Sequence, residues 1–149
     1  MSSRSTSVKP VGVVGAGSFG SAIANLLASN TDVILYARNP DVAEKISKTR
    51  VLQGQKLADN ISPTNDLKYV ADNCEIIFPI VPSENFPALI DDLSYFIKPY
   101  HILIHGTKGL IVPKENWEED ESIRIEKEDV YTMSRLIMAQ TLAVRVGCL

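Results

Sequence analysis

The sequence predicts an α/β fold built on a doubly wound parallel sheet, and three observations lead to this prediction. Short apolar stretches alternate with segments of helical period along the 149 residues. The stretch Glu75–Val81 is apolar after its charged first residue, which is typical of a strand buried on both faces of a parallel sheet. A glycine-rich turn, Gly15–Gly20, joins the first apolar stretch to the first helical segment. Strands that alternate with helices imply a parallel sheet whose crossovers are right-handed.

The first elements are bounded by local signals. Asn30–Asp32 ends the first helix, and the strand that follows is rich in β-branched and aromatic residues. Asn39 and Pro40 suit the start of a second helix. The first helix carries an apolar stripe made of Phe19, Ala22, Ile23, Leu26 and Leu27. The elements expected here are strand Val11–Val14, a helix from Ser18, strand Val33–Ala37 and a helix from Asn39 to Thr49.

The later elements continue the alternation. The stretch Arg50–Asn65 has no clear period and is expected to be irregular, and the charged stretch Glu115–Asp129 is expected to be a solvated excursion. The helix after the third strand is amphipathic, with a stripe of Phe86, Leu89, Ile90 and Leu93. The elements expected here are a short helix Asp66–Ala71, strand Glu75–Val81, helix Glu84–Phe96, strand His101–His105, helix Val130–Thr141 and strand Leu142–Leu149.

Composition excludes several classes of protein. Hydrophobic residues make up 45% and charged residues 22% of the chain, as in soluble globular domains, and the net charge of -3 favours neither nucleic acid nor anionic membrane as a partner. Apolar runs stay well short of the roughly 18 residues that span a bilayer. Residues 1–10 are polar without the apolar core of a secretory signal, so we expect a flexible segment before one domain at residues 11–149, in the cytoplasm. Cys74 and Cys148 have neither metal-ligand nor disulfide-framework spacing, which predicts two reduced thiols and no metal site.

The glycine-rich turn has the G-x-G-x-x-G spacing, read here as Gly15, Gly17 and Gly20, with Ser18 and Phe19 between the last two. Alone the pattern is weak, but here it follows a predicted strand and opens a predicted helix, which is the context of a dinucleotide-binding loop. Gly15 permits the tight turn, Gly17 lets a pyrophosphate approach the backbone, and Gly20 lets the helix pack against the strand. The free N–H groups and the dipole of the helix would attract the anion. The sequence therefore predicts a Rossmann-type NAD(P)-binding domain.

Arg38 stands where NAD enzymes usually carry an acid, at the end of the second predicted strand. A guanidinium can bind a ribose 2′-phosphate through paired hydrogen bonds, so the residue favours NADP(H), or tolerance of both cofactors. The alternative is an arginine stacked over the adenine, which would not discriminate. The predicted cofactor is therefore NADP or NAD.

Two further segments follow predicted strands at the edge where ligands bind in such sheets. In Pro79–Ser83 two prolines stiffen the loop, and Ser83 could equally be a helix cap. In His105–Leu110 glycines flank Lys108, whose charge could hold a carbonyl or phosphate oxygen, although a surface lysine is an equal possibility. We expect His105 and His101 to be buried and hydrogen-bonded, with His105 nearer the site. Met133 and Met138 are expected to pack against neighbouring side chains.

Three motifs together resemble the N-terminal domain of the NAD(P)-dependent glycerol-3-phosphate dehydrogenases. They are Gly15–Ala22, Ile80–Ser83 and Thr107–Leu110. The resemblance implies hydride transfer between dihydroxyacetone phosphate and sn-glycerol 3-phosphate, in glycerol-3-phosphate metabolism that supplies phospholipid biosynthesis. It also implies that Phe19, Val81 and Pro82 border the nicotinamide and that Lys108 is one of two active-site lysines.

The resemblance covers the whole chain but only about the first half of a family member. Members continue into a helical domain that supplies a second lysine and most of the substrate phosphate site. We therefore expect an enzyme fragment that lacks the C-terminal helical domain and is inactive alone, and exposed apolar surface leads us to expect a homo-oligomer. The alternatives are a non-catalytic dinucleotide-binding module and a related reductase of the ketopantoate reductase or hydroxyacid dehydrogenase type.

Overall fold

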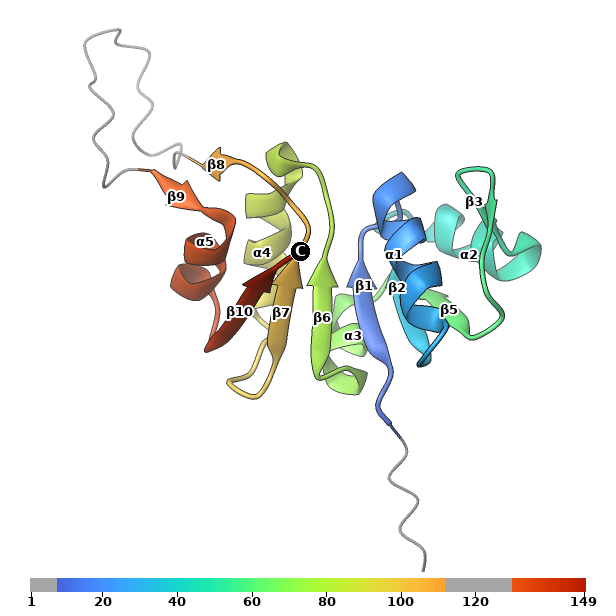
Figure 1. Cartoon of the computed structure of the whole chain (residues 1–149), viewed down its shortest axis with the longest axis horizontal. Coiled ribbons are helices and arrows are strands. Elements are labelled where there is room, and N and C mark those ends of the chain that lie inside the picture. The colour runs from blue at the N-terminus through green and yellow to red at the C-terminus, as the bar shows by residue number, and fades with distance from the viewer. Residues whose placement is uncertain (1–7, 112–129) are drawn as a thin grey trace, which may run out of the picture.

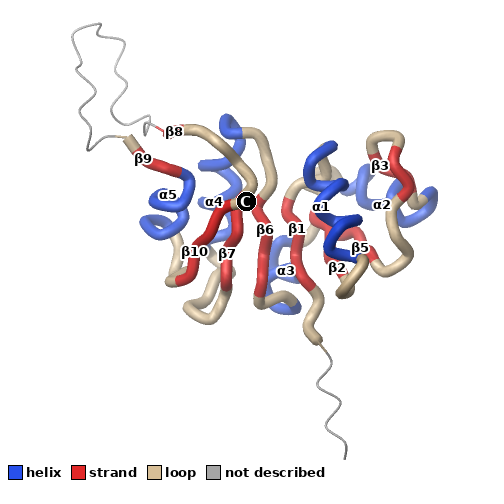
Figure 2. Tube along the Cα trace, viewed as in Figure 1, coloured by secondary structure: helices blue, strands red, loops and turns tan. Residues whose placement is uncertain are grey.

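A computed structural model describes residues 8–111 and 130–149 of the chain (Figure 1). The expected excursion at Glu115–Asp129 and most of the expected flexible segment at residues 1–10 lie outside these ranges. Strands and helices alternate along the described chain (Figure 2). Each helix in the described ranges is too short or too polar to cross a membrane.

Six parallel strands form one sheet in the order β10-β7-β6-β1-β2-β5. This is the doubly wound order, in which the chain builds outward from β1 in one direction and then in the other. The neighbours β1 and β6 mark the point where the direction changes, and ligands of such sheets bind beside the carboxyl ends of these strands. The strands are β1 (Val11–Val14), β2 (Val33–Tyr36), β5 (Ile61–Thr64), β6 (Ile76–Pro79), β7 (Ile102–His105) and β10 (Arg145–Cys148). The predicted fold class is confirmed.

Helices cover both faces of this sheet (Figure 1). On one face α3, α4 and α5 pack over a core that includes Phe86, Leu103 and Ile137. On the other face α1 and α2 pack over a core that includes Leu35 and Ile46. The helices are α1 (Ser18–Ala28), α2 (Pro40–Thr49), α3 (Leu67–Asn73), α4 (Phe86–Ser94) and α5 (Met133–Gln140), with a 3₁₀ turn η1 (Ser83–Asn85) before α4. The sheet therefore lies between two buried cores.

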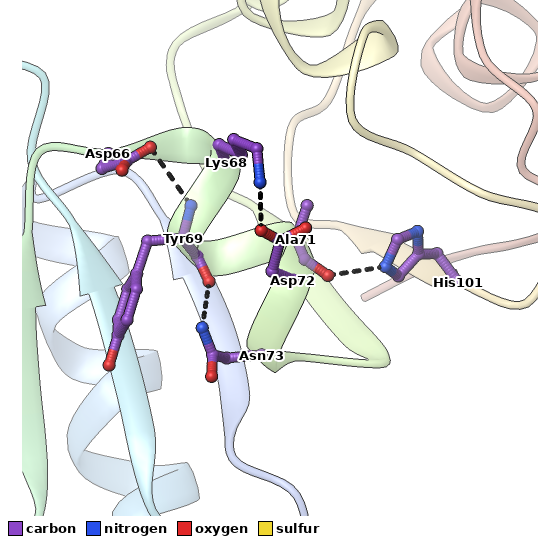
Figure 3. Close-up of polar contacts among 7 residues, drawn as sticks. All are labelled: Asp66, Lys68, Tyr69, Ala71, Asp72, Asn73 and His101. Carbon is purple, nitrogen blue, oxygen red and sulfur yellow. Dashed lines mark hydrogen bonds and ion pairs between the residues drawn. The ribbon is translucent and has the colours of Figure 1, made fainter.

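Side-chain caps begin α2 and α3. The Asn39 side chain accepts a hydrogen bond of 2.9 Å from the Asp41 N–H, and the Asp66 side chain accepts one of 3.1 Å from the Tyr69 N–H. Figure 3 shows the Asp66 cap together with the ion pair between Lys68 and Asp72 on α3. These local contacts place both helices near the starts that the sequence predicts.

The sheet contains a strand that the sequence analysis missed. The stretch Arg50–Asn65, expected to be irregular, forms a short hairpin of β3 (Val51–Leu52) and β4 (Gln55–Lys56) and then β5. Pro63 obscures the strand pattern, but β5 is at the edge of the sheet, where a missing N–H is tolerated. The Arg50 guanidinium donates hydrogen bonds to the carbonyl oxygens of Ile61, at 2.8 Å, and Ala58. These contacts within the stretch and the pairing of β5 with β2 together order it.

One predicted boundary, one predicted packing contact and one predicted stripe are also corrected. The last helix begins at Met133 rather than Val130, because β9 (Tyr131–Thr132) pairs with β8 (Leu110–Ile111) and Thr132 caps the helix. Met133 is buried as expected, but Met138 is 59% exposed. On α1 the buried face is made of Gly20, Ser21 and Ala24, whereas Phe19, Ala22 and Leu26 are exposed. Small residues face the sheet there because the helix approaches it too closely for large ones.

Candidate functional site

The glycine loop closes the gap between β1 and α1 through two backbone contacts that only glycine permits. Gly15 has φ = +132°, and a Cβ on it would lie 2.0 Å from the carbonyl oxygen of Ile80. A Cβ on Gly20 would lie 1.9 Å from the carbonyl oxygen of Gly15. The loop therefore brings the start of α1 against both β1 and the segment after β6.

Gly17 lies at the N-cap of α1 and faces open space. A Cβ built on it would meet no atom within 4 Å, and no side chain caps the helix. The first turn carries no acidic residue, and Ser18 and Phe19 are exposed. The unpaired N–H groups and the positive end of the helix dipole thus face an accessible surface that suits an anion.

A cleft of two adjoining lobes lies along this edge of the sheet, and Gly17, Ile80, Val81 and Pro82 line both lobes. The first, called the β2 lobe, has a volume of about 290 Å³ and extends past Tyr36 and Arg38 to Asp92 on α4. The second, called the β7 lobe, has a volume of about 420 Å³ and extends past Phe19 to Lys108. The uncapped start of α1 is therefore central to an elongated cleft.

The β2 lobe combines apolar walls with charged groups at its rim. Arg38 is exposed directly after the end of β2. Burial raises the pKa of Tyr36, the Asp92 carboxylate raises it further, and the positive charge of Arg38 lowers it. The Tyr36 hydroxyl accordingly stays protonated at neutral pH and can donate a hydrogen bond. No local signal in the sequence marks Asp92, because only helix packing turns it toward the lobe.

The β7 lobe is held by the loop after β7. The Thr107 hydroxyl donates a hydrogen bond of 2.6 Å to the Val81 carbonyl oxygen, which joins the loops after β7 and β6. Phe19 packs against Gly106, where a Cβ would lie 2.8 Å from the ring. Lys108 follows and is exposed at the lobe. Its ammonium group is therefore free to approach a bound molecule.

His105 lies behind this loop and is 6% exposed. Its Nδ1 lies 3.1 Å from the Thr107 carbonyl oxygen and its Nε2 lies 2.8 Å from Ser134 Oγ. Because a carbonyl can only accept, Nδ1 donates to Thr107 and the neutral Nε2 accepts from the Ser134 hydroxyl. Burial lowers the pKa of His105, and the hydrogen bond to Thr107 partly opposes that effect.

This pKa shift predicts a loss of stability in mild acid. Between the lowered pKa of folded His105 and the ordinary value of 6.5, the unfolded chain binds more protons, so acidification through this window favours unfolding. The contribution of neutral His105 to the unfolding free energy should be complete above pH 6.5 and should decline below it. Guanidinium unfolding between pH 5 and 8, at values spaced by roughly half a unit, measures it. His105→Asn should flatten the profile, and an unchanged slope would contradict the assignment.

The other buried histidine, His101, lies away from the cleft, before the start of β7. Its Nδ1 accepts a hydrogen bond of 2.8 Å from the Lys98 N–H, and its Nε2 donates one of 2.9 Å to the Ala71 carbonyl oxygen on α3, as Figure 3 shows. Both histidines are thus buried and hydrogen-bonded, which confirms the prediction, and only His105 adjoins the cleft.

The structure gathers the sequence-predicted site residues around one cleft. All of them line one lobe or both: Gly15, Gly17, Ser18, Phe19, Gly20, Arg38, Val81, Pro82 and Lys108. The sequence analysis did not select Tyr36, Asp92 or Ser134. Tyr36 could have been found from its place at the carboxyl end of β2, whereas the other two depend on helix packing.

Comparison with known proteins agrees with the predicted resemblance. Residues 10–143 match a family model described as NAD-dependent glycerol-3-phosphate dehydrogenase N-terminus. A glycerol-3-phosphate dehydrogenase [NAD(P)+] of Syntrophobacter fumaroxidans is 32% identical over 148 residues, which cover 94% of this chain and 39% of the relative. One from Pseudomonas paraeruginosa is 40% identical over 110 residues, covering 70% of this chain and 32% of the relative. The chain thus spans about two fifths or less of these relatives.

Solved structures share the fold. The crystal structure of glycerol-3-phosphate dehydrogenase from Coxiella burnetii has a TM-score of 0.70 at 22% identity, covering 94% of this chain and 39% of the other. A ketopantoate reductase from Ralstonia eutropha has a TM-score of 0.66 at 16% identity, covering 93% and 40%. The structural likeness therefore extends to this reductase as well, and the sequence matches make the finer distinction. The chain belongs to the NAD-dependent glycerol-3-phosphate dehydrogenase family, whose N-terminal domain it matches.

Proposed function

We propose that residues 11–149 form an NAD(P)-binding domain that serves an oxidoreductase interconverting dihydroxyacetone phosphate and sn-glycerol 3-phosphate. The observation that carries the proposal is the two-lobed cleft centred on Gly17 and the uncapped start of α1. An elongated dinucleotide fits this arrangement, because its central pyrophosphate would meet the helix N–H groups while its two halves enter the two lobes. The family match supports the same reading.

The residues divide the work of holding the cofactor. Gly15 and Gly20 shape the loop, and the N–H groups after Gly17, including that of Ser18, bind the pyrophosphate. In the β2 lobe, Arg38 binds the 2′-phosphate of NADP through charge-assisted hydrogen bonds and tolerates the 2′-hydroxyl of NAD. In the β7 lobe, the nicotinamide half is bordered by Phe19, Val81 and Pro82.

Lys108 is the catalytic residue of the proposal. When bound, the reduced cofactor would supply a hydride to the carbonyl carbon of dihydroxyacetone phosphate, and the carbonyl oxygen would take up a proton that comes from the solvent. The Lys108 ammonium, exposed at the β7 lobe, donates a hydrogen bond to that oxygen and stabilises the negative charge that develops on it. In the reverse direction the same ammonium holds the hydroxyl oxygen of glycerol 3-phosphate.

Gly17→Val tests cofactor binding without disturbing the fold. The added side chain would fill the centre of the cleft, and the absence of neighbours within 4 Å leaves room for it in the folded chain. We expect NADPH affinity to fall by at least about tenfold and the unfolding free energy to change by no more than about 1 kcal/mol. Titration calorimetry and guanidinium unfolding measure the two effects.

Ala22→Val is the matched control, because Ala22 is exposed on the same helix and lines neither lobe. It should bind NADPH as the unaltered chain does. Equal affinity of the Gly17 variant and this control would contradict the placement of the pyrophosphate, and an unaltered chain that binds neither NADPH nor NADH would contradict the proposed function.

Self-association and a cytoplasmic location complete the proposal. Met138, Leu142, Val144 and Leu149 are each more than half exposed on the α5 and β10 side of the sheet, and exposed apolar surface of this kind favours association. Sedimentation at rising concentration should therefore detect a homo-oligomer, and a monomer throughout would contradict it.

Both cysteines are free thiols, as in proteins of a reducing compartment. Burial raises the pKa of the Cys74 thiol to about 11, which keeps it protonated and unreactive.

A further inference from the structure

A chain of hydrogen bonds behind the β7 lobe connects α5 to the loop that carries Lys108. It runs from the Ser134 hydroxyl to His105 Nε2, from His105 Nδ1 to the Thr107 carbonyl oxygen, and from the Thr107 hydroxyl to the Val81 carbonyl oxygen. We call these four residues the His105 relay. Its contacts measure 2.8, 3.1 and 2.6 Å in that order, and His105 and Thr107 are 6% and 7% exposed.

The relay holds the peptide before Lys108 from both sides. Thr107 accepts a bond through its carbonyl and donates one through its hydroxyl, so neither its backbone nor its side chain can rotate without breaking a buried contact. Lys108 is the next residue in the chain. The direction in which its side chain leaves the backbone is therefore set by the relay.

Packing alone does not account for a histidine at this position. The ring of His105 packs edge-on against Phe86, with centroids 5.8 Å apart, and an apolar side chain could make that contact without the desolvation cost of a buried imidazole. The polar atoms of the ring are used in full by Thr107 and Ser134. The relay thus has a directional role that an apolar residue could not perform.

We propose that His105 is a positioning residue, which fixes the Thr107–Lys108 backbone and so shapes the β7 lobe for the nicotinamide half of the cofactor. This inference rests on the proposed function, because the proposed function places the nicotinamide half of the cofactor in the β7 lobe. The relay touches the β2 lobe only through Val81, which lines both lobes. Breaking the relay should weaken ligands that need the β7 lobe and spare ligands confined to the β2 lobe.

Two ligands and two amide substitutions separate these effects. NADPH would occupy both lobes, whereas adenosine 2′,5′-bisphosphate would occupy the β2 lobe and the end of α1. Asparagine places its N–H group near the Nδ1 position, and glutamine places its amide near the Nε2 position. We expect His105→Gln to weaken NADPH about tenfold and the bisphosphate less than about twofold, and His105→Asn to keep most of the NADPH affinity.

Ser134→Ala removes the other end of the relay and is the gentler variant, because Ser134 is only half-buried. It should shift the ratio of the two affinities in the same direction, by about threefold. His101→Gln is the matched control, since His101 is fully buried with two hydrogen bonds but lies away from the cleft. It should lower stability while leaving the ratio unchanged, as a merely structural role would.

Hydrogen exchange at the Gly106 amide gives a readout that needs no ligand. This N–H donates to the Pro79 carbonyl oxygen at 3.2 Å, beside the relay. Under conditions in which His105→Gln and His101→Gln have equal unfolding free energies, this amide should exchange about tenfold faster in His105→Gln.

The outcomes separate the two proposals. If the unaltered chain binds both ligands but His105→Gln leaves their ratio and the Gly106 exchange unchanged, the positioning role is wrong and the proposed function stands. If the unaltered chain binds neither ligand, the proposed function fails, and the Gly106 exchange still decides whether the relay orders the loop.

Discussion

Gly15→Ala is expected to lower the unfolding free energy by several kcal/mol, the largest stability effect that we predict for a single methyl group in this protein. The new Cβ would lie 2.0 Å from the carbonyl oxygen of Ile80, which is backbone and cannot rotate away. The φ of +132° is also unfavourable for alanine. A steric overlap of this kind and an unfavourable backbone conformation each cost about 1–3 kcal/mol in proteins. Guanidinium unfolding gives the loss, and NADPH titration should show that binding is lost with the loop.

Gly54→Ala is the control that separates the effect of the steric overlap from the effect of the unfavourable φ. Gly54 also has a positive φ, +75°, but a Cβ on it would meet nothing within 4 Å. The unfolding free energy of Gly54→Ala should fall by only about 1 kcal/mol, because only the positive φ is unfavourable there. If the two alanine variants were equally stable, the contact between Gly15 and Ile80 would not be the reason for glycine in the loop.

Arg38→Asp is expected to weaken NADPH binding much more than NADH binding, because it reverses the charge that we propose to bind the ribose 2′-phosphate. Charge-assisted hydrogen bonds contribute about 1.5–3 kcal/mol each, so NADPH should lose at least about tenfold in affinity. Aspartate can accept a hydrogen bond from a ribose 2′-hydroxyl, so NADH should change less. Calorimetric titration of both cofactors at low salt measures the ratio of the two affinities.

Lys45→Asp makes the same change of charge on the exposed surface of α2 and lines neither lobe. It should leave the ratio of the two affinities unchanged. If the Arg38 variant lost affinity for NADPH and NADH equally, Arg38 would stack on the adenine instead of binding the 2′-phosphate.

Much of the site could be predicted because its chemistry is local in sequence. The spacing of Gly15, Gly17 and Gly20 encodes a turn that only glycine can make, and the contacts of Gly15 and Gly20 confirm the reason. Arg38 was located by its place after a strand, and strand ends of a parallel sheet share one edge. These inferences need only the identity of a residue and the element it follows.

The missed features depend on contacts between distant segments. The strand β5 contains Pro63 and shows no strand pattern, and it forms because β2 offers a free edge beside it. Phe19 looks like part of a buried stripe but is 51% exposed, because α1 approaches the sheet through Gly20. Periodicity reports which residues could be buried, while the approach distance of the helix decides which are.

The fold class and the glycine loop are predictable from the sequence, because both follow from residue types at fixed local spacing, and three motifs carry the resemblance to the family. Long-range contacts in the folded chain join the loops after β6 and β7 through Thr107 and Val81, and bring Ser134 on α5 to His105. Ser134 and His105 are separated by 29 positions in the chain. Hydrogen bonds over such separations form only after the sheet has placed both partners, so no local pattern records them.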